Sequence, residues 1–104
     1  MIFIETSVFT EDVRELIDDD GYARLQRHLV AHPEAGDLIQ GAGGLRKIRW
    51  LAGGKGKRSG VRIIYFHLAA NDQIRMLLIY RKGLQDDLTP GQKAVLRRIN
   101  EAWL

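Results

Sequence analysis

Residues 41–62 read GAGGLRKIRWLAGGKGKRSGVR, and this stretch determines both the strand pattern and the charge of the chain. No acidic residue interrupts the chain between Asp37 and Asp72. Residues 45–51 alternate as a half-buried strand does, residues 52–60 form a glycine-rich basic loop, and Val61 begins a second apolar run. The pattern predicts a β-hairpin with a cationic tip. The stretch holds seven of the sixteen basic residues, namely Arg46, Lys47, Arg49, Lys55, Lys57, Arg58 and Arg62.

The alternation within the first hairpin strand divides its side chains between two faces. Ile48 and Trp50 lie on the face that we expect to contact the core. Lys47 and Arg49 share the opposite face, about 7 Å apart along the strand, which is close to the separation of successive phosphates in a nucleic acid strand. Arg62 joins that face in only one register of the hairpin, because a slip of one residue turns it toward Trp50. A solvated sheet face is the alternative interpretation.

The remaining segments predict a small α+β fold, a single domain that includes residues 1–104. Thr10 is the expected cap of a first helix, and Pro33 ends a second helix. Thr89 followed by Pro90 begins a C-terminal helix. Its apolar stripe belongs on the sheet or in a groove of a partner protein, and consists of Val95, Leu96, Ile99 and Trp103. The expected order is a strand at 2–6, a helix from Thr10, a helix at 20–32, a loop at 37–44, antiparallel strands at 45–51, 61–68 and 74–80, and the last helix.

Charge is divided unevenly along the chain. Residues 1–37 carry nine acidic and three basic side chains, a formal charge of −6, whereas residues 38–104 carry thirteen basic and four acidic side chains, a charge of +9. Such a distribution concentrates polyanions at one face, so nucleic acid is a candidate partner, although basic loops are often only solvated. The chain has no cysteine. No segment approaches the roughly 18 apolar residues of a membrane span, so we expect a cytoplasmic protein without membrane association.

Metal and nucleotide sites are poorly supported by the sequence. His28 and His32 share a helical face at a metal-ligand spacing, but neither a glutamate of the HExxH kind nor a third ligand accompanies them. The run Asp18, Asp19 and Asp20 lacks the spacing of a calcium loop and fits a helix end followed by a new N-cap. The GAGG segment lacks the Walker lysine and the GxGxxG spacing. We therefore expect no metal and no cofactor.

Four segments in this order resemble the RelE/ParE superfamily of type II toxins, and most closely its HigB-like branch. They are GAGGLRKIRW, the basic loop GGKGKRSG, the strand VRIIYFHL and the strand end LLIYRKG. The resemblance extends over nearly the whole chain. It implies a ribosome-dependent endoribonuclease that cleaves messenger RNA without a metal and is neutralised by a cognate antitoxin. It also implies that operator DNA is bound only through the complex of toxin with antitoxin.

The resemblance also implies roles for individual residues. In the strand expected at 45–51, the basic pair of the family corresponds to Lys47 and Arg49. The arginine that begins the next strand corresponds to Arg62. The basic position after the strand at 74–80 corresponds to Lys82. The expected catalytic set is completed by Lys57. The expected RNA-binding set consists of Arg46, Lys55, Arg58, Tyr80 and Arg81.

Two departures from the RelE pattern leave the general base open. Gly83 stands where RelE has an arginine after its terminal lysine, and Arg81 is the nearest substitute. The RelE tyrosine beyond that turn has no counterpart in residues 85–88, which read QDDL. Lys47 or Lys57 could serve as the base, because a lysine crowded among other cations loses its proton more easily.

Cleavage by attack of the RNA 2′-hydroxyl on the adjacent phosphate requires stabilisation of added negative charge, which clustered arginine and lysine supply. The sequence contains no group of catalytic carboxylates, which argues against a two-metal nuclease. Two other functions stay open. One is inhibition of DNA gyrase, associated with the ParE-like branch, and the other is a non-catalytic module that binds nucleic acid or regulates an operon.

Overall fold

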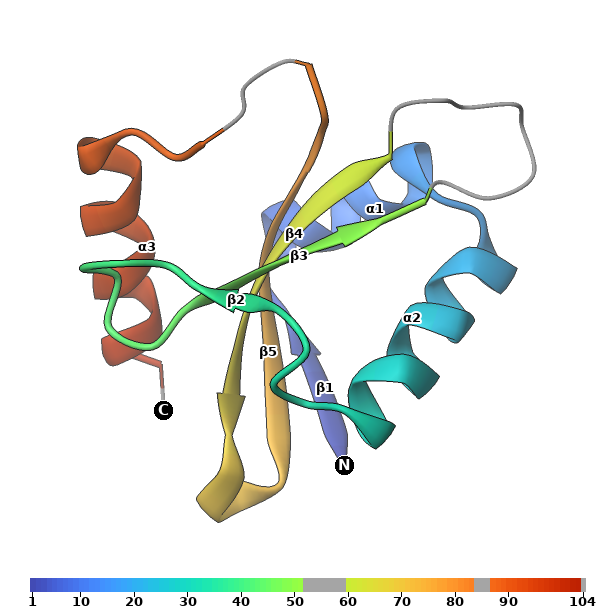
Figure 1. Cartoon of the computed structure of the whole chain (residues 1–104), viewed down its shortest axis with the longest axis horizontal. Coiled ribbons are helices and arrows are strands. Elements are labelled where there is room, and N and C mark those ends of the chain that lie inside the picture. Colours follow the sequence, from blue (N-terminus) through green and yellow to red (C-terminus); the bar gives the residue numbers. More distant parts are fainter. Residues whose placement is uncertain (52–59, 84–86, 104) are drawn as a thin grey trace.

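The structure is a computed structural model that describes residues 1–51, 60–83 and 87–103. A five-stranded sheet with the order β1-β5-β4-β3-β2 forms its centre (Figure 1). β1 pairs in parallel with β5, and the other neighbouring strands are antiparallel. The predicted α+β class is confirmed. The elements are β1 (Ile2–Glu5), α1 (Ser7–Leu16), α2 (Asp19–Ala31), β2 (Asp37–Leu38), β3 (Arg46–Trp50), β4 (Val61–Leu68), a 3₁₀ turn (Ala69–Asn71), β5 (Gln73–Arg81) and α3 (Pro90–Glu101).

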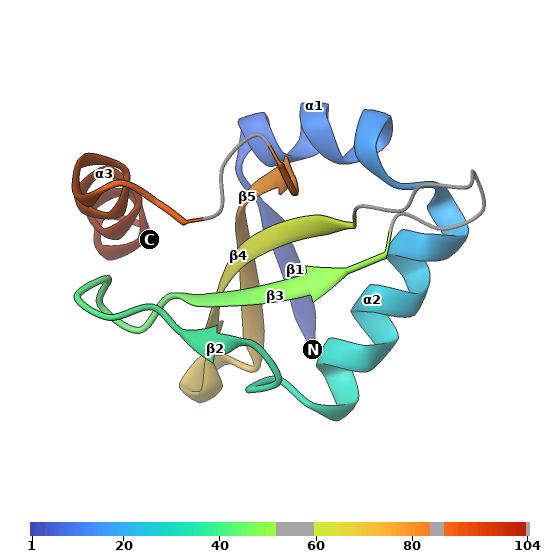
Figure 2. The ribbon, with the colours of Figure 1, turned by 45° about the horizontal axis from the view of Figure 1, so that its top comes forward.

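The sheet is covered on both faces. α1 and α2 lie on one side and α3 lies on the other (Figure 2). The α1–α2 side buries Phe9 and Val13 of α1 and Leu25 and Leu29 of α2 against Ile63 and other residues of the central strands. The α3 side buries Leu96 against Leu45, Ile64 and Leu77. β4 and β5 therefore have apolar side chains on both faces, which is typical of central strands.

The first helix begins earlier than predicted. α1 starts at Ser7, and the Thr6 hydroxyl is the N-cap that accepts a hydrogen bond from the Phe9 amide at 3.1 Å. The prediction that Thr10 caps this helix is wrong, because the Thr10 hydroxyl instead donates to a Glu5 carboxylate oxygen at 2.6 Å. The earlier start places Phe9 in the core with no exposed surface.

The second helix was predicted at 20–32 and spans 19–31, so each end differs by one residue. The Asp18 carboxylate accepts a hydrogen bond from the Gly21 amide, and α2 ends at Ala31, before Pro33. The aspartate run is therefore a helix boundary, as the sequence indicated.

The segment after α2 is fixed by a buried tyrosine of β4. The Tyr65 hydroxyl donates to the Pro33 carbonyl at 2.8 Å and accepts from the Gly36 amide at 2.9 Å. Burial raises the pKa of Tyr65, so the phenol stays neutral and can make both bonds. The predicted loop at 37–44 instead begins with β2, whose two residues pair with β3.

The C-terminal helix begins as predicted but presents a different face to the sheet. Thr89 and Gln92 form a capping box, and Pro90 occupies the first turn. Leu96 is buried, whereas Val95 and Ile99 of the predicted stripe are exposed. Their place toward the sheet is taken by Asn100, whose backbone carbonyl and side-chain oxygen both accept hydrogen bonds from the Arg75 guanidinium. None of the helices in the described residues is long and apolar enough to cross a membrane.

Candidate nucleic-acid interface

The pairing of the central strands brings the predicted arginines together. Arg49 of β3 lies opposite Arg62 of β4, and Arg62 lies opposite Tyr80 of β5. Lys47 pairs with Ile64, two positions along the same strands. Residues that pair directly point to the same face of a sheet. The register that places Arg62 on the face of Lys47 and Arg49 is therefore the one observed.

A β-bulge adds Lys82 to this face. Ile64 pairs with Leu78 and Tyr65 pairs with Met76, so Leu77 is an extra residue in β5 without a partner on β4. In a regular strand Lys82 would point to the same side as Met76, toward α1 and α2. The extra residue shifts the alternation by one and turns Lys82 toward the α3 side. Bulges that redirect a side chain in this way are frequent beside functional sites.

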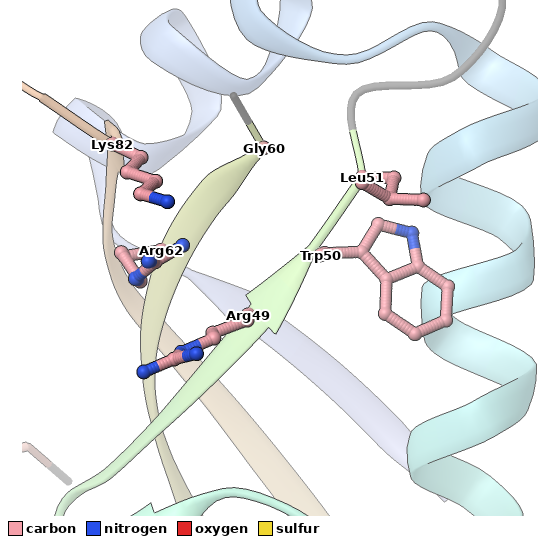
Figure 3. Close-up of a pocket in the computed structure, with 6 residues that line it drawn as sticks. All are labelled: Arg49, Trp50, Leu51, Gly60, Arg62 and Lys82. Carbon is pink, nitrogen blue, oxygen red and sulfur yellow. The ribbon is translucent and has the colours of Figure 1, made fainter. Parts of the chain in front are cut away.

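The three cationic side chains line one cavity of about 210 Å³. Arg49 of β3, Arg62 of β4 and Lys82, the residue after β5, project into it, whereas the Trp50 side chain points toward α2 (Figure 3). The Trp50 indole donates a hydrogen bond to the Gly21 carbonyl of α2 at 3.1 Å, which fixes the end of β3.

Arg62 is the most constrained cation of the cavity. Only 8% of its surface is exposed, and its hydrogen bond to the carbonyl of the adjacent Val61 is long, at 3.5 Å. Within the described residues, no carboxylate forms an ion pair with Arg62, Arg49 or Lys82. Like charges on directly opposed strand residues destabilise a sheet, and a buried charge without a counter-charge is costly. The arrangement favours the binding of an anion in the cavity.

Gly60 is a residue of this site that the sequence pattern did not single out. A Cβ atom at this position would lie 2.3 Å from the Trp50 carbonyl oxygen, so only glycine permits this close approach of β3 and β4. The Gly60 carbonyl accepts a hydrogen bond from the Lys82 amide at 3.1 Å. Gly60 thus holds the ends of β3, β4 and β5 together beside the three cations.

Lys47 lies outside this cavity although it shares the face of Arg49. Its ammonium group donates to the Asp87 carboxylate at 2.7 Å, and both residues line a second cavity of about 340 Å³. The hydrogen bond from Lys47 and the charges of Lys47 and Lys93 hold the pKa of Asp87 below its ordinary value.

The structure separates the predicted RNA-binding residues. Arg46 lies on the other face of the sheet, where its guanidinium donates to the carbonyls of Glu34 and Gly36 at 3.3 and 2.8 Å. Arg81 is exposed and pairs with Val61, on the face opposite to Lys82. Tyr80 is buried beside Arg62, and its hydroxyl is not accessible to solvent. Lys55, Lys57 and Arg58 lie outside the described residues.

The two histidines at the end of α2 lie beside each other, and His28 also packs against Trp50. The ring centroids of His28 and His32 are 5.4 Å apart, and the His28 ring lies at the same distance from the Trp50 ring. Among the described residues, no group of three or more histidine, cysteine or carboxylate side chains is arranged to hold a metal ion.

The architecture is that of a small α+β protein with the RelE fold. The isolated E. coli RelE toxin matches with a TM-score of 0.58 and 15% identity, over 94% of this chain and 97% of that chain. A free E. coli RelE variant with two arginines replaced by alanine matches with a TM-score of 0.58 and 13% identity, over 98% of this chain and 97% of that chain. A chain of the intact E. coli RelBE toxin–antitoxin complex matches with a TM-score of 0.56 and 16% identity, over 75% of this chain and 92% of that chain. No family model matches the chain. At these identities the likeness is one of fold, and the HigB-like branch stays a prediction.

Proposed function

We propose that this protein is the toxin of a type II toxin–antitoxin system and cleaves messenger RNA on the ribosome without a metal. The observation that carries the proposal is the buried Arg62 guanidinium, which has no carboxylate partner in the described part of the chain and is flanked by Arg49 and Lys82. The RelE fold supports the same conclusion, because the similar proteins of known structure are toxins.

In the proposed reaction the RNA cleaves itself at a phosphate held in the cavity. The 2′-oxygen forms a bond to phosphorus while the bond from phosphorus to the 5′-oxygen breaks, which leaves a 2′,3′-cyclic phosphate and a 5′-hydroxyl. The 2′-hydroxyl releases its proton to a base or to water, and the 5′-oxygen takes up a proton. The phosphorane formed between these steps carries additional negative charge.

Arg49, Arg62 and Lys82 stabilise this phosphorane. Because burial and close packing hold the Arg62 side chain, its position changes little when charge develops on the phosphate, and fixed donors of this kind are effective in catalysis. Its planar guanidinium can contact two phosphate oxygens at once. Removal of one such donor costs about 3–4 kcal/mol of transition-state stabilisation.

We further propose a cognate antitoxin as the protein partner, with operator DNA bound only by the complex of the two. The similarity to the toxin–antitoxin complex supports this partner. An antitoxin would prevent RNA from reaching the cationic cavity.

The proposal is tested in a translation reaction with a defined message. Purified protein is added, new RNA ends are mapped by primer extension, and the same message without ribosomes is the control. We expect new ends only on the translated message. Intact message would contradict the proposal, and inhibition of gyrase supercoiling by the same preparation would then support the ParE-like alternative.

Two arginine variants make this test specific to the cavity. Arg62→Gln removes the buried cation, whereas Arg24→Gln removes an exposed cation from α2, on the opposite side of the sheet. Both variants lower the net charge equally. Loss of cleavage in the first variant but not in the second would assign the effect to the cavity and exclude a general effect of charge.

A further inference from the structure

The second cavity lies further along β3 from the proposed active site, and cationic side chains line it as well. It is lined by Lys47 of β3 and Lys93 of α3, together with Asp37, Gln40 and Asp87. Lys47 and Arg49 point to the same face and are two residues apart, which corresponds to about 7 Å along the strand. This distance is close to that between successive phosphates of a single nucleic acid strand. An RNA strand with one phosphate at Arg62 and Arg49 would therefore bring a neighbouring phosphate to Lys47.

In the free protein, the carboxylate of Asp87 already occupies the position next to Lys47 where this neighbouring phosphate would bind. The Asp87 carboxylate accepts the Lys47 hydrogen bond at 2.7 Å, although the side chain of Asp87 is 79% exposed and that of Lys47 only 22%. Lys93 adds a second positive charge near the same carboxylate. A carboxylate between two ammonium groups presents the charge and the acceptor oxygens that a phosphate would present.

The exposure of Asp87 makes this ion pair replaceable. Exposed ion pairs are weak, so a competing anion can displace the carboxylate into solvent. The depressed pKa of Asp87 keeps the carboxylate charged at neutral pH, so mild acid does not release Lys47.

We propose that this cavity is a second phosphate subsite for the RNA strand, and that Asp87 occupies the phosphate position in the free protein. The inference rests on the proposed function, since it places the subsite next to the phosphate that is cleaved. Asp87 then acts as an internal competitor of RNA. An RNA phosphate has to displace the Asp87 carboxylate from Lys47 before the RNA strand can lie along the whole of β3.

Removal of the Asp87 charge should therefore strengthen binding. The cavity holds two ammonium groups, of Lys47 and Lys93, and two carboxylates, of Asp37 and Asp87. Asp87→Asn removes one carboxylate and leaves the cavity with one net positive charge for the phosphate. We expect Asp87→Asn to raise the affinity for single-stranded RNA by about three- to tenfold at low salt. The dependence of log K on log salt should become steeper by about 0.7, which is the contribution of one phosphate contact on a single strand.

The test measures binding of a short oligonucleotide with 2′-O-methyl riboses, which cannot be cleaved by attack of a 2′-hydroxyl. Affinity is followed by fluorescence anisotropy over a range of salt concentrations for the wild type and Asp87→Asn. Glu101→Gln is the matched control, because it also removes an exposed carboxylate from an ion pair, with Arg97 at 3.0 Å, away from the cavity. We expect this control to match the wild type within about twofold.

A Lys47→Gln background tests whether the gain acts through Lys47. Asp87→Asn should give little gain when Lys47 is absent, as a coupled pair does in a double-mutant cycle. A gain that persists without Lys47, or an Asp87→Asn variant that behaves like Glu101→Gln, would overturn the inference. Message cleavage without any effect of Asp87 would refute the subsite and leave the proposed function intact. If Asp87→Asn strengthens RNA binding but the protein does not cleave message, the subsite is supported and the proposed function is refuted.

Discussion

Two arginines on the same face of the sheet have the same exposure and opposite surroundings. Arg62 of β4 and Arg75 of β5 each expose 8% of their surface. Arg75 donates to Gln73, to two oxygens of Asn100 and to the Trp103 carbonyl. Arg62 donates only one long bond, to the carbonyl of its neighbour, within the described residues. Burial alone therefore does not distinguish a structural arginine from a candidate ligand-binding one, whereas the hydrogen-bond partners of the guanidinium do separate Arg75 from Arg62.

The surroundings of Arg75 explain why this cation is structural. Its guanidinium carbon lies 5.8 Å from the Phe66 ring centroid and 5.3 Å from the Trp103 ring centroid. The carbonyls that it binds belong to the C-terminal end of α3, where the helix dipole favours a positive charge. Arg75 thereby fastens α3 to the sheet. Within residues 1–51, 60–83 and 87–103, no comparable set of acceptors surrounds Arg62, which is why we propose a ligand-binding role for this arginine.

The largest effect expected from this comparison concerns catalysis. Arg62→Gln should lower the rate of message cleavage by about 100- to 1,000-fold, because a preorganised donor to the phosphorane is lost. Initial rates of new RNA ends, measured at equal concentrations of folded protein, provide the test. A rate within about threefold of the wild type would remove Arg62 from the site.

The next effect concerns stability. Arg75→Ala should lower the free energy of unfolding by about 2–4 kcal/mol, because the carbonyls of Asn100 and Trp103 lose a charged donor and two aromatic rings lose their contact. Urea denaturation gives this value. If Arg62→Ala destabilises the protein as much as Arg75→Ala does, the distinction between the two arginines fails.

A smaller loss of stability is expected on the other face of the sheet. Tyr65→Phe removes the hydroxyl that bonds Pro33 and Gly36, which leaves buried backbone groups without their partner. The free energy of unfolding should fall by about 1–3 kcal/mol while message cleavage at equal folded protein is unchanged. A loss of cleavage in stably folded Tyr65→Phe would show that the segment after α2 takes part in the site.

The smallest effect has the opposite sign. Arg62→Met keeps much of the side-chain volume and removes a buried charge that lacks a described counter-charge. The free energy of unfolding should rise by about 0.5–1 kcal/mol. Thermal or urea unfolding of the wild type and this variant at low salt provides the measurement. A clear loss of stability would reveal structural partners of Arg62.

The features that the sequence predicted correctly are those that depend on local periodicity. Alternation within β3 placed Lys47 and Arg49 on one face and Ile48 and Trp50 on the other, as the structure shows. The cap at Thr89 followed from its hydroxyl and the proline after it. The acidic residues after Thr10 indicated that Thr10 caps the first helix, but the Glu5 carboxylate engages its hydroxyl and Thr6 is the cap.

The features that could not be predicted depend on pairing between distant segments. The register that places Arg62 opposite Arg49 depends on the pairing of β3 with β4, and the sequence of either strand alone does not determine it. The bulge at Leu77 leaves no mark on the sequence, because residues 76–79 are apolar throughout and show no alternation to interrupt. Arg75 gave no signal either, since its partners Asn100 and Trp103 are far along the chain. The ion pair of Lys47 was equally invisible, because its partner Asp87 belongs to the segment before α3.

The most direct test of the central claim is the salt dependence of RNA binding by the free protein. An uncleavable 2′-O-methyl oligonucleotide is titrated into the wild type, Arg62→Gln and Arg24→Gln at several salt concentrations. If the Arg62 guanidinium holds a phosphate, Arg62→Gln should bind about tenfold more weakly, with a salt slope shallower by about 0.7, and Arg24→Gln should match the wild type. Equal affinities and slopes for Arg62→Gln and the wild type would contradict the claim that the buried arginine binds RNA.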